Sequence, residues 1–454
     1  MNVLRLHDTA EGRVVDVVPR EPGKFSMYVC GLTVYDLPHI GHGRMALVFD
    51  VLRRYLEWSG LDVKFVSNIT DIEDRIIARA NERGIPTEEL TEAYEKAWYE
   101  ASDGLGIKRP DADPHATAYV DKMVDFIAEL IMRGHAYETS DGVYFSVETL
   151  PGYGLLARQS LESLRAGASE RLDEPEDKRG PFDFALWKKA KPGEPTWPSP
   201  WGDGRPGWHI ECTVMSLALL GDDFDLHGGG QDLAFPHHEN ERAQALGAGH
   251  RFARRWVHNG FVEVSGEKMS KSVGNFKTLP DLLERTDGRA YRLLVLQSHY
   301  RSPLEVTPNS IARAERSLAG LDAFARRTAD LSETDPDPGV LELFREHMDN
   351  DLQTPAATAL LFDTVTRANA ALDNGDTERV APLAAAVRAI SAAMGLELRA
   401  GDDEVDAATA DLVRQRDEAR ASKDFAVADR VRDELVAAGW VVEDTPAGTQ
   451  VRRA

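Results

Sequence analysis

Hydrophobic residues in the first 84 positions follow two spacings, which predict strands and helices in alternation. Residues 25–31 (FSMYVCG) and 62–68 (DVKFVSN) are short apolar runs typical of buried strands. Apolar positions between 44 and 57 recur every three or four residues, on one face of a helix. A second helix is expected up to Gly84, opening with a Thr/Asp cap in TDIEDRII. This order begins a βαβ unit and predicts a parallel sheet.

The next part of the chain, up to about residue 205, is expected to be an insertion into this α/β domain. Helical patterns cover 87–103 and 114–133, and short strand-like pieces follow around YETSDGVYFSV. The Pro- and Trp-rich stretch KPGEPTWPSPWGDGRPG is typical of a loop. A further helix and strand set is predicted from 208 to 265, which returns the chain to the α/β domain.

The C-terminal third is predicted to be mainly helical. Pro- and Asp-rich stretches at 333–339 and 398–406 mark two boundaries, and the Ala/Leu-rich residues 340–396 between them favour helices. A compact tail closes the chain, with a helix pair expected over 407–438 and a short hairpin in WVVEDTPAGTQVRR. The predicted fold is therefore an α/β domain with an inserted region, then helical domains and a small C-terminal domain.

Composition limits the classes of protein to consider. The 454 residues are 42% hydrophobic, enough for two to four domains, and 53 basic against 76 acidic residues give a net charge of −23. This acidity argues against a general nucleic-acid binder, whose surface is usually basic. No apolar run approaches the roughly 18 residues of a membrane span, and no secretory signal is visible. Two cysteines exclude a disulfide scaffold and favour a reducing, cytoplasmic location.

The stretch PHIGHGR places His39 and His42 at a predicted helix start, eight residues after the Cys30–Gly31 pair. A helix N-terminus attracts anions through its free N–H groups and its dipole, and histidines there can donate to a phosphate. Gly41 leaves room for a flat ligand against the backbone. A histidine near a helix start is more often a polar cap, so the tetrapeptide alone does not decide between the two interpretations.

The stretch DLHGGGQDLAFPHHENE carries a second set of candidates. Its glycines, with Gly229 at their centre, follow a strand-like FDL and let a ligand approach the backbone closely. Asp232 is placed to accept from a ribose hydroxyl. A third stretch, GEKMSKSVGN (266–275), carries Lys268 and Lys271 in a predicted loop that could bring mobile charge to a polyphosphate. A solvated lysine loop is the common alternative.

Both cysteines of the chain fall in glycine- and histidine-rich stretches, which suggests a metal site. His237 and Glu241 are spaced i, i+4, so both project from one helical face. Together with Cys30 and Cys212 they would supply two sulfurs, one nitrogen and one oxygen, a donor set that favours Zn²⁺. The spacing fits no zinc finger, and His238, at i, i+3 from Glu241, is an equally good ligand on this geometry. The alternative is that Cys212 is a small buried hydrophobe.

The stretches together resemble the class I aminoacyl-tRNA synthetases. HIGH at 39–42 and KMSKS at 268–272 correspond to the two signatures of that class, in its order and at its wide separation. CGLTVYD, NITDIEDRII, RPGWHIEC, HGGGQDLAFPHHENE and KDFAVADRVRDEL resemble the cysteinyl-tRNA synthetase family over essentially the full length. One departure is Leu32, where that family usually has proline. The change alters turn stiffness beside Cys30 and removes no ligand.

The resemblance implies roles for individual residues. One zinc ion per chain would be held by Cys30, Cys212, His237 and Glu241, which chooses His237 over His238. The substrate cysteine would contact Gly31, Thr70 and Trp208. ATP, accompanied by Mg²⁺, would be bound by residues of the two signatures and of the glycine-rich stretch: His39, Gly41, His42, Gly229, Asp232, Lys268 and Lys271.

The resemblance also implies a reaction, partners and domain limits. Cysteine would be joined to ATP as an adenylate with release of pyrophosphate, and then transferred to the 3′ end of tRNA-Cys. We expect a cytoplasmic monomer with no membrane association. The implied domains are a Rossmann-like catalytic domain, a KMSKS and stem-contact region, a helical bundle and an anticodon-recognition domain, at 1–270 (with a connective insertion at 109–205), 271–332, 333–400 and 401–454.

Two rival hypotheses come from the same residues. Relatives in mycothiol biosynthesis join cysteine to an amino sugar and share the signature and zinc stretches. The tail at 401–454 and Glu241 favour the tRNA enzyme over that ligase. A second rival is a non-catalytic Rossmann-like module held together by a structural zinc site, in which the lysine loop has no role.

Overall fold

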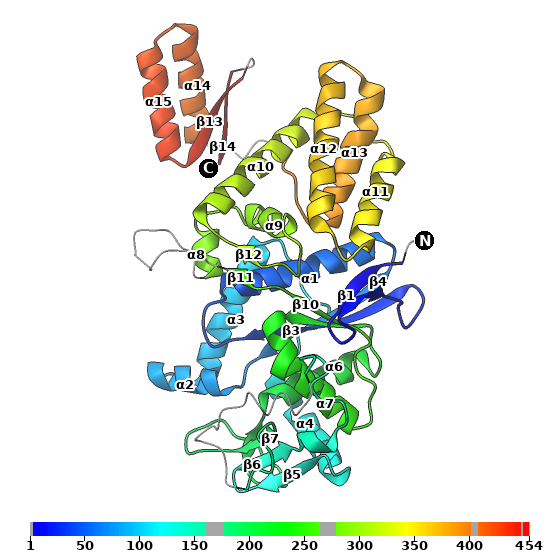
Figure 1. Ribbon diagram of the computed structural model, residues 1–454. Helices are drawn as coiled ribbons and strands as arrows, with labels where there is room; N and C mark the ends of the chain where they lie inside the picture. Colours follow the sequence, from blue (N-terminus) through cyan, green and yellow to red (C-terminus); the bar gives the residue numbers. More distant parts are fainter. Residues whose placement is uncertain (1–2, 160–176, 264–277, 401–406, 446–447, 454) are drawn as a thin grey trace. The chain divides into compact units, whose positions relative to one another are not determined.

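The computed structural model describes residues 3–159, 177–263, 278–400, 407–445 and 448–453, which form two compact units (Figure 1). Unit 1 comprises Met1–Leu318 and Thr334–Glu397, and unit 2 comprises Ala319–Glu333 and Leu398–Ala454. The candidate metal ligands and the described candidate ligand-binding residues belong to unit 1.

A four-stranded parallel sheet forms the centre of unit 1, in the order β10-β9-β3-β4. Its elements are β3 (Lys24–Thr33), α1 (Ile40–Trp58), β4 (Asp62–Thr70), α6 (Trp208–Leu220), β9 (Leu226–Gly230) and β10 (Trp256–Asn259). Helix α1 packs on β3, β4 and β9, and α6 packs on β3 and β4 (Figure 1). The predicted parallel α/β sheet is confirmed, and its strands bring candidate residues to their carboxyl ends, where ligands bind in such sheets.

Residues between β4 and α6 form helices and a second sheet. The helices are α2 (Asp74–Arg83), α3 (Thr87–Gly104) and α4 (Val120–Met132), with short 3₁₀ turns at Ala116–Tyr119 and Val147–Thr149. The sheet is antiparallel, in the order β5-β6-β7-β8, with β5 (Ala136–Thr139), β6 (Gly142–Phe145), β7 (Phe184–Lys189) and β8 (Gly204–Pro206). Strand β8 corrects the prediction that the whole Pro- and Trp-rich stretch is loop, because its end pairs with β7.

Two local predictions are wrong at element ends. The cap of α2 is Glu73, whose carboxylate accepts from the Arg75 N–H. Thr70 is instead the last residue of β4, and the Asp71 carboxylate accepts from Thr117. The glycine triplet lies inside β9 and not after it. The predicted helix start at the HIGH signature is confirmed, because α1 begins at Ile40 with His39 as its N-cap.

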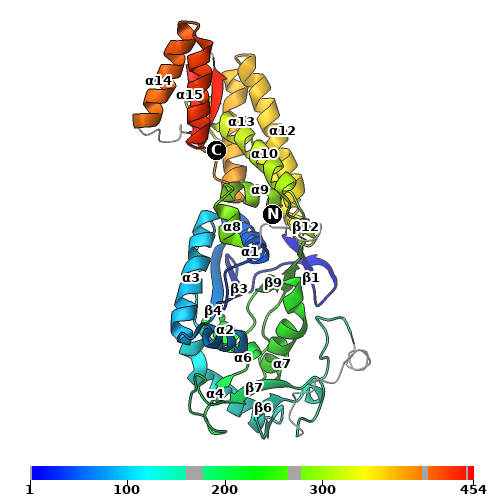
Figure 2. The same cartoon turned by 90° about the vertical axis from the view of Figure 1, so that its left-hand side faces the viewer.

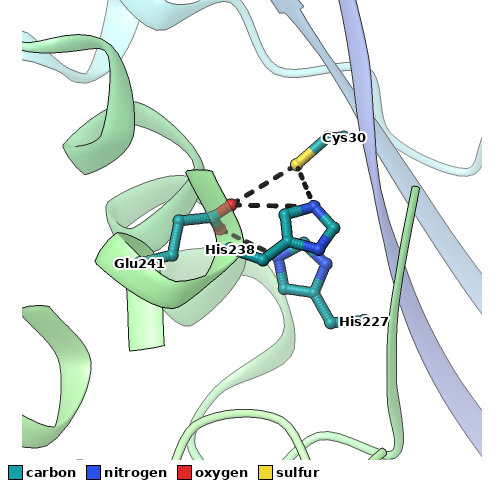
Figure 3. A group of neighbouring side chains, drawn as sticks. All are labelled: Cys30, His227, His238 and Glu241. Atoms are coloured by element: carbon teal, nitrogen blue, oxygen red, sulfur yellow. Dashed lines mark hydrogen bonds and ion pairs between the residues drawn. The ribbon is translucent and has the colours of Figure 1, made fainter. Parts of the chain in front are cut away.

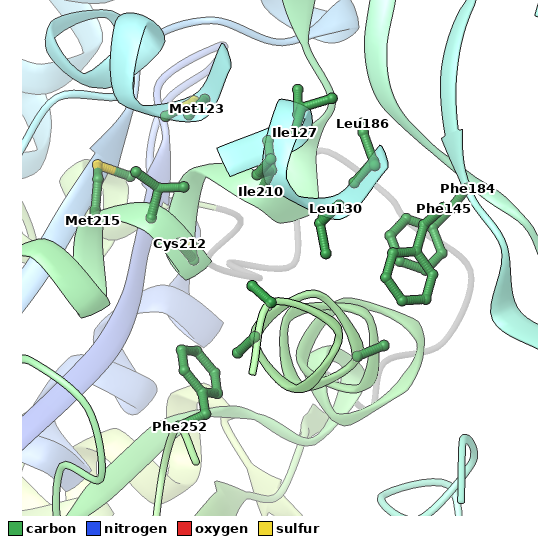
Figure 4. Packing of buried hydrophobic residues seen from close by; sticks show 14 of the residues in the cluster. Met123, Ile127, Leu130, Phe145, Phe184, Leu186, Ile210, Cys212, Met215 and Phe252 are labelled. Carbon is green, nitrogen blue, oxygen red and sulfur yellow. The ribbon is translucent and has the colours of Figure 1, made fainter. Parts of the chain in front are cut away.

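A large buried cluster fixes α6, the helix that carries Cys212 (Figure 4). Met123, Ile127 and Leu130 on α4 belong to this cluster together with Ile210 and Met215 on α6. All five side chains are fully buried. Because burial of each such side chain contributes roughly 1.5–3 kcal/mol, the cluster holds α6 firmly against α4 and the sheet.

The remaining elements of unit 1 are mainly helical. They are β1 (Arg5–Asp8), β2 (Arg13–Asp16), turns Gln231–Leu233 and Ala234–His238, α7 (Glu239–Gly247), β11 (Val262–Glu263), α8 (Leu279–Leu283), α9 (Gly288–Leu296), β12 (Leu304–Glu305), α10 (Pro308–Arg327, which also contributes to unit 2), α11 (Pro338–Asp349), α12 (Thr354–Asp373) and α13 (Thr377–Ala393). Helices α11, α12 and α13 pack on one another (Figure 1), and α12 and α13 also lie side by side in Figure 2. The predicted helical region 340–396 is confirmed.

Most of unit 2 is the predicted C-terminal tail. It consists of α14 (Ala407–Ala421), α15 (Phe425–Ala437), β13 (Trp440–Thr445) and β14 (Gly448–Arg453), and the two strands form an antiparallel hairpin. Val431, Leu435, Trp440 and Val442 make its small core. The predicted helix pair and hairpin are both confirmed.

Candidate active site and metal centre

A bulge in β3 presents Cys30 at the carboxyl end of the strand. Val29 pairs with Ser67 and Leu32 with Ile69, so Cys30 and Gly31 face the single residue Asn68. Such a bulge redirects side chains and is common beside active sites. A Cβ on Gly31 would lie 1.5 Å from the Asn68 carbonyl oxygen, so only glycine fits there. The glycine after Cys30 thus permits the bulge that positions the thiol.

The four predicted metal ligands come together in unit 1. The Cys30 Sγ lies 3.6 Å from the Cys212 Sγ, and the His237 Nε2 lies 3.1 Å from the Glu241 Oε1. One donor atom from each of the four residues lies within 4.8 Å of the other three, and all four residues are buried. Strand β3, helix α6, the turn Ala234–His238 and helix α7 each supply one donor. The group can hold a metal ion.

A second, overlapping donor group shares Cys30 and Glu241 but replaces the other two ligands with His227 and His238 (Figure 3). The His238 Nε2 lies 3.2 Å from the Cys30 Sγ and 3.9 Å from the Glu241 Oε1. The His227 Nε2 lies 2.8 Å from the other carboxylate oxygen, Glu241 Oε2. The choice between His237 and His238 therefore stays a prediction, since both rings point Nε2 at the same carboxylate.

Neighbouring side chains hold both of these imidazole rings. The His237 Nδ1 lies 2.9 Å from His209 Nδ1, and the His238 Nδ1 lies 2.8 Å from His258 Nε2, which Thr9 contacts on the far side. Burial lowers the pKa of His237 and of His238 well below the usual value, so both rings are neutral. A neutral ring held at one nitrogen leaves the other for a metal.

Burial also governs the two thiols. It raises the pKa of Cys30 and that of Cys212 above the usual value. Both cysteines are free and not joined as a disulfide. Coordination by a metal ion would favour the thiolate forms and release their protons, so metal binding at this group is expected to depend on pH.

The three predicted cysteine-binding residues surround this donor group. The Gly31 N–H donates to Asn68 Oδ1 at 2.9 Å, and the Asn68 amide donates to Thr70 Oγ1 at 3.1 Å. The Trp208 ring stacks on His237 with centroids 4.1 Å apart. Sequence reasoning missed Asn68, which joins Gly31 to Thr70 and lies 3.6 Å from the Cys212 Sγ. The signal was its position at the end of a predicted strand, in NIT.

The two signature histidines form a reciprocal cap at the start of α1. The His42 N–H donates to His39 Nδ1 at 3.3 Å, the His39 N–H donates to His42 Nδ1 at 3.2 Å, and the rings stack at 3.5 Å. Burial lowers the pKa of His39, against the charge of Asp232, and lowers the pKa of His42 to about 3. Both rings are therefore neutral, with the proton on Nε2, and act as hydrogen-bond donors and not as cations.

The glycine-rich strand lies next to these residues. Gly229 is buried, and a Cβ there would come within 2.9 Å of the His238 ring. A Cβ on Gly41 would lie 3.0 Å from the His39 ring, so both glycines allow close approach. Asp232 is exposed, and its charge acts on His39.

Lys268 and Lys271 lie outside the described residues, but both flanks of their segment contact the α1 region. On one side, the carbonyls of Gly260 and Phe261 accept from the Arg44 guanidinium at 2.9 and 2.5 Å. On the other side, the Leu279 N–H donates to the Pro38 carbonyl at 2.7 Å. The described residues on either side of this segment, Gly260 and Phe261 before it and Leu279 after it, therefore contact α1 or the residue before its cap.

Comparisons with known families cover nearly the whole chain. Residues 16–316 match the family described as tRNA synthetases class I (C) catalytic domain, 343–399 match the DALR domain, and 402–452 match the Cysteinyl-tRNA ligase anticodon binding domain. The Mycobacterium tuberculosis methionyl-tRNA synthetase in complex with methionyl-adenylate has a TM-score of 0.64 at 17% identity, over 89% of this chain and 96% of that chain. The fold and the matched catalytic domain define a class I aminoacyl-tRNA synthetase.

Sequence relatives specify the family further. The Cysteine--tRNA ligase of Halorhodospira halophila is 47% identical over 99% of this chain and all of its own length. The Cysteine--tRNA ligase of Alkalilimnicola ehrlichii is 46% identical over the same shares. The chain belongs to the cysteine–tRNA ligase family, which excludes the non-catalytic zinc module. Among the residues that the structure describes, no helix is both long enough and apolar enough to cross a bilayer.

Proposed function

We propose that this chain activates L-cysteine with ATP to give cysteinyl-adenylate and pyrophosphate, and then transfers cysteine to the 3′ end of tRNA-Cys. The convergence of four buried ligands, Cys30, Cys212, His237 and Glu241, in a chain 47% identical to a Cysteine--tRNA ligase carries this proposal. An amino-sugar acceptor, as in mycothiol biosynthesis, is disfavoured because residues 402–452 match an anticodon binding domain.

The donor chemistry fits zinc. Two sulfurs with an imidazole select Zn²⁺ over Mg²⁺ or Ca²⁺, which prefer oxygen ligands. Cys30, Cys212, His237 and Glu241 would hold one ion per chain. When bound, zinc would act as a Lewis acid that prefers a thiolate to a hydroxyl group as its ligand. This preference would favour cysteine over serine, two amino acids that pocket shape alone distinguishes weakly.

The chain's own residues would then orient the amino acid. Trp208, stacked on His237, forms an apolar wall beside the thiol end. Gly31 lets the substrate approach the β3 backbone, and Thr70 offers a hydroxyl group fixed by Asn68. Catalysis of adenylate formation requires mainly that the carboxylate be held in line with the α-phosphorus.

ATP would lie at the start of α1. The Nε2–H groups of His39 and His42 and the helix N-terminus would donate to its phosphates, and Gly41 and Gly229 would leave room for the nucleotide. Asp232 would accept from the ribose. The reaction needs no protein nucleophile, because the substrate carboxylate and later the tRNA ribose hydroxyl group are the attacking groups.

The charge on the phosphates would be neutralised by Lys268 and Lys271 and by the Mg²⁺ that accompanies ATP. The flanks of the KMSKS segment, held at Arg44 and at Pro38, support this assignment. Lysine contacts that strengthen as pyrophosphate departs would lower the activation free energy of adenylate formation. They would do so without tightening the binding of ATP in the ground state.

The domain and partner assignments follow the family. We propose a catalytic domain at 1–270 with a connective insertion at 109–205, a stem-contact region at 271–332, a helical bundle at 333–400 and an anticodon-recognition domain at 401–454. The matched anticodon binding domain supports the last of these. Two free, buried cysteines suit a reducing cytoplasm, and we propose that the chain acts there as a monomer.

A pyrophosphate-exchange screen over all twenty amino acids tests the function, coupled to elemental analysis of the purified protein. We expect exchange with cysteine alone, about one zinc per chain, and charging of tRNA-Cys. Exchange with a different amino acid, or condensation of cysteine with an amino sugar in place of tRNA charging, would refute the proposal.

A further inference from the structure

Glu211, in the first turn of α6, carries a carboxyl group that is only partly satisfied. The residue is 0% exposed, and its Oε2 accepts from the Thr70 hydroxyl group at 3.0 Å. Its Oε1 has no hydrogen-bond partner among the described residues. Arg205, whose charge acts on Glu211, donates to Asp74 instead. A buried carboxyl oxygen without a donor is unfavourable, so a ligand that brings a donor gains affinity there.

The hydrogen bonds of Thr70 are fixed in direction by its neighbours. The Gly31 N–H donates to Asn68 Oδ1, which turns the Asn68 NH₂ group toward Thr70. The Thr70 oxygen therefore accepts from Asn68, and its single proton goes to Glu211. A hydroxyl group has one donor and two acceptor positions, so Thr70 has only an acceptor lone pair left.

When Glu211 is a carboxylate, two acceptors and no donor remain at this position, a pattern that suits a ligand group with N–H donors. An amino acid offers an ammonium group, which only donates, and a carboxylate, which only accepts. We propose that Glu211, with Thr70, binds the α-ammonium group of the amino-acid substrate. This inference rests on the proposed function for the identity of that substrate as cysteine.

The position agrees with the rest of the site. Glu211 precedes Cys212 in the chain, and Asn68 contacts both the Cys212 Sγ and Thr70. The thiol end of the substrate and its ammonium group thus bind to neighbouring residues. Acceptors at Glu211 and Thr70 would repel the substrate carboxylate, which in this proposal lies on the side of the proposed ATP site at His39 and His42.

Two analogues of cysteine separate the ammonium group from the carboxylate. Cysteamine has the thiol and the ammonium group, and 3-mercaptopropionate has the thiol and the carboxylate. Each is measured as a competitive inhibitor of cysteine-dependent pyrophosphate exchange, with wild type and with Glu211→Gln. The glutamine keeps the size and an oxygen for the Thr70 hydroxyl group but replaces the free oxygen with an NH₂ donor.

Glu211→Gln is expected to raise the KM for cysteine and the inhibition constant of cysteamine about 10- to 100-fold, as for a lost charge-assisted hydrogen bond. The inhibition constant of 3-mercaptopropionate should stay within about threefold, with zinc content unchanged. Glu239→Gln is the matched control: Glu239 is equally buried and accepts from the Leu156 N–H and Arg242. It should leave the ratio of the two inhibition constants unchanged.

Thr70→Val keeps the test decisive if Glu211→Gln does not fold. It removes the second acceptor, so it should also raise the inhibition constant of cysteamine more than that of 3-mercaptopropionate. An equal loss for both analogues in the folded variants would overturn the inference and make Glu211 a structural residue. Absence of cysteine-dependent exchange in wild type would refute the proposed function instead, so the two failures are distinguishable.

Discussion

The sulfur atoms of Cys30 and Cys212 lie 3.6 Å apart, although 182 positions separate the two residues in the chain. A bulged strand supplies one thiol and a helix fixed in the core supplies the other. Both are buried and free, and burial raises the pKa of each. This pairing gives the site a donor group that can hold a metal ion, and the predictions below depend on what surrounds it.

Asn68 is expected to position the amino-acid substrate. Asn68→Ala removes the bonds to the Gly31 N–H and to Thr70, which leaves both groups free to reorient. We expect the KM for cysteine in pyrophosphate exchange to rise about tenfold, as for one or two lost hydrogen bonds, with the KM for ATP unchanged. An unchanged KM for cysteine would show that Gly31 and Thr70 need no such support.

Arg44 is expected to stabilise the contact between α1 and the backbone at 260–261 and 299–302. It is 1% exposed, and its guanidinium donates to the carbonyls of Gly260, Phe261, His299, Tyr300 and Ser302. Arg44→Met removes all five of these hydrogen bonds, although the carbonyls of Gly260, Phe261, His299 and Tyr300 each keep a second donor. The free energy of unfolding in urea should therefore fall by about 3 kcal/mol. The same change at Arg13, which is 70% exposed, should alter it by less than about 0.5 kcal/mol. Similar losses at both positions would contradict this role.

His42 is expected to make the protein sensitive to acid. Burial lowers its pKa from 6.5 to about 3 in the folded state, so the unfolded chain binds the proton more readily. Stability is therefore full above pH 6.5 and falls as the pH drops from 6.5 toward 3. His42→Asn should reduce the loss between pH 7 and 5 by about 1–2 kcal/mol, measured by urea unfolding at each pH. Parallel pH profiles for variant and wild type would exclude this explanation.

The C-terminal tail is expected to serve tRNA and not amino-acid activation. Its hairpin and helix pair form their own core in unit 2, whereas the candidate metal ligands belong to unit 1. Removal of residues 401–454 should leave cysteine-dependent pyrophosphate exchange within about threefold of wild type and lower kcat/KM for tRNA charging at least about 100-fold, since a missing base contact alone costs about 1–3 kcal/mol. A truncated chain that charges tRNA-Cys normally would contradict an anticodon role.

Element order was predictable because periodicity is a local signal. The runs at 25–31 and 62–68 are strands, and the tail forms its hairpin, as expected. Element ends were less predictable. The glycines of β9 look like a strand terminator, but Gly228 faces Phe49, whose ring would lie 2.3 Å from a Cβ, so a close approach explains the triplet. The sequence does not predict this contact, because Gly228 and Phe49 are distant in the chain and meet only in the folded structure.

The site was predictable where residue type limits the chemistry. Two cysteines in 454 residues left few metal ligands to choose from. The supporting residues were not predictable, because their roles arise from strand pairing and long-range contacts. Asn68 gains its role from the β3 bulge, and Thr9 reaches His258 across 249 positions. The lowered pKa values of the HIGH histidines were not predictable either, since the burial that lowers them is a tertiary property.

The most direct test of the metal-based selection of cysteine is a paired measurement on wild type and Cys212→Ser. Zinc content and the rates of pyrophosphate exchange with cysteine and with serine are determined on the same preparations. Wild type should hold about one zinc and exchange with cysteine only. Cys212→Ser should lose the metal and at least about 100-fold of cysteine-dependent exchange, while ATP affinity stays within about threefold. A metal-free variant that activates cysteine at the wild-type rate would contradict the account.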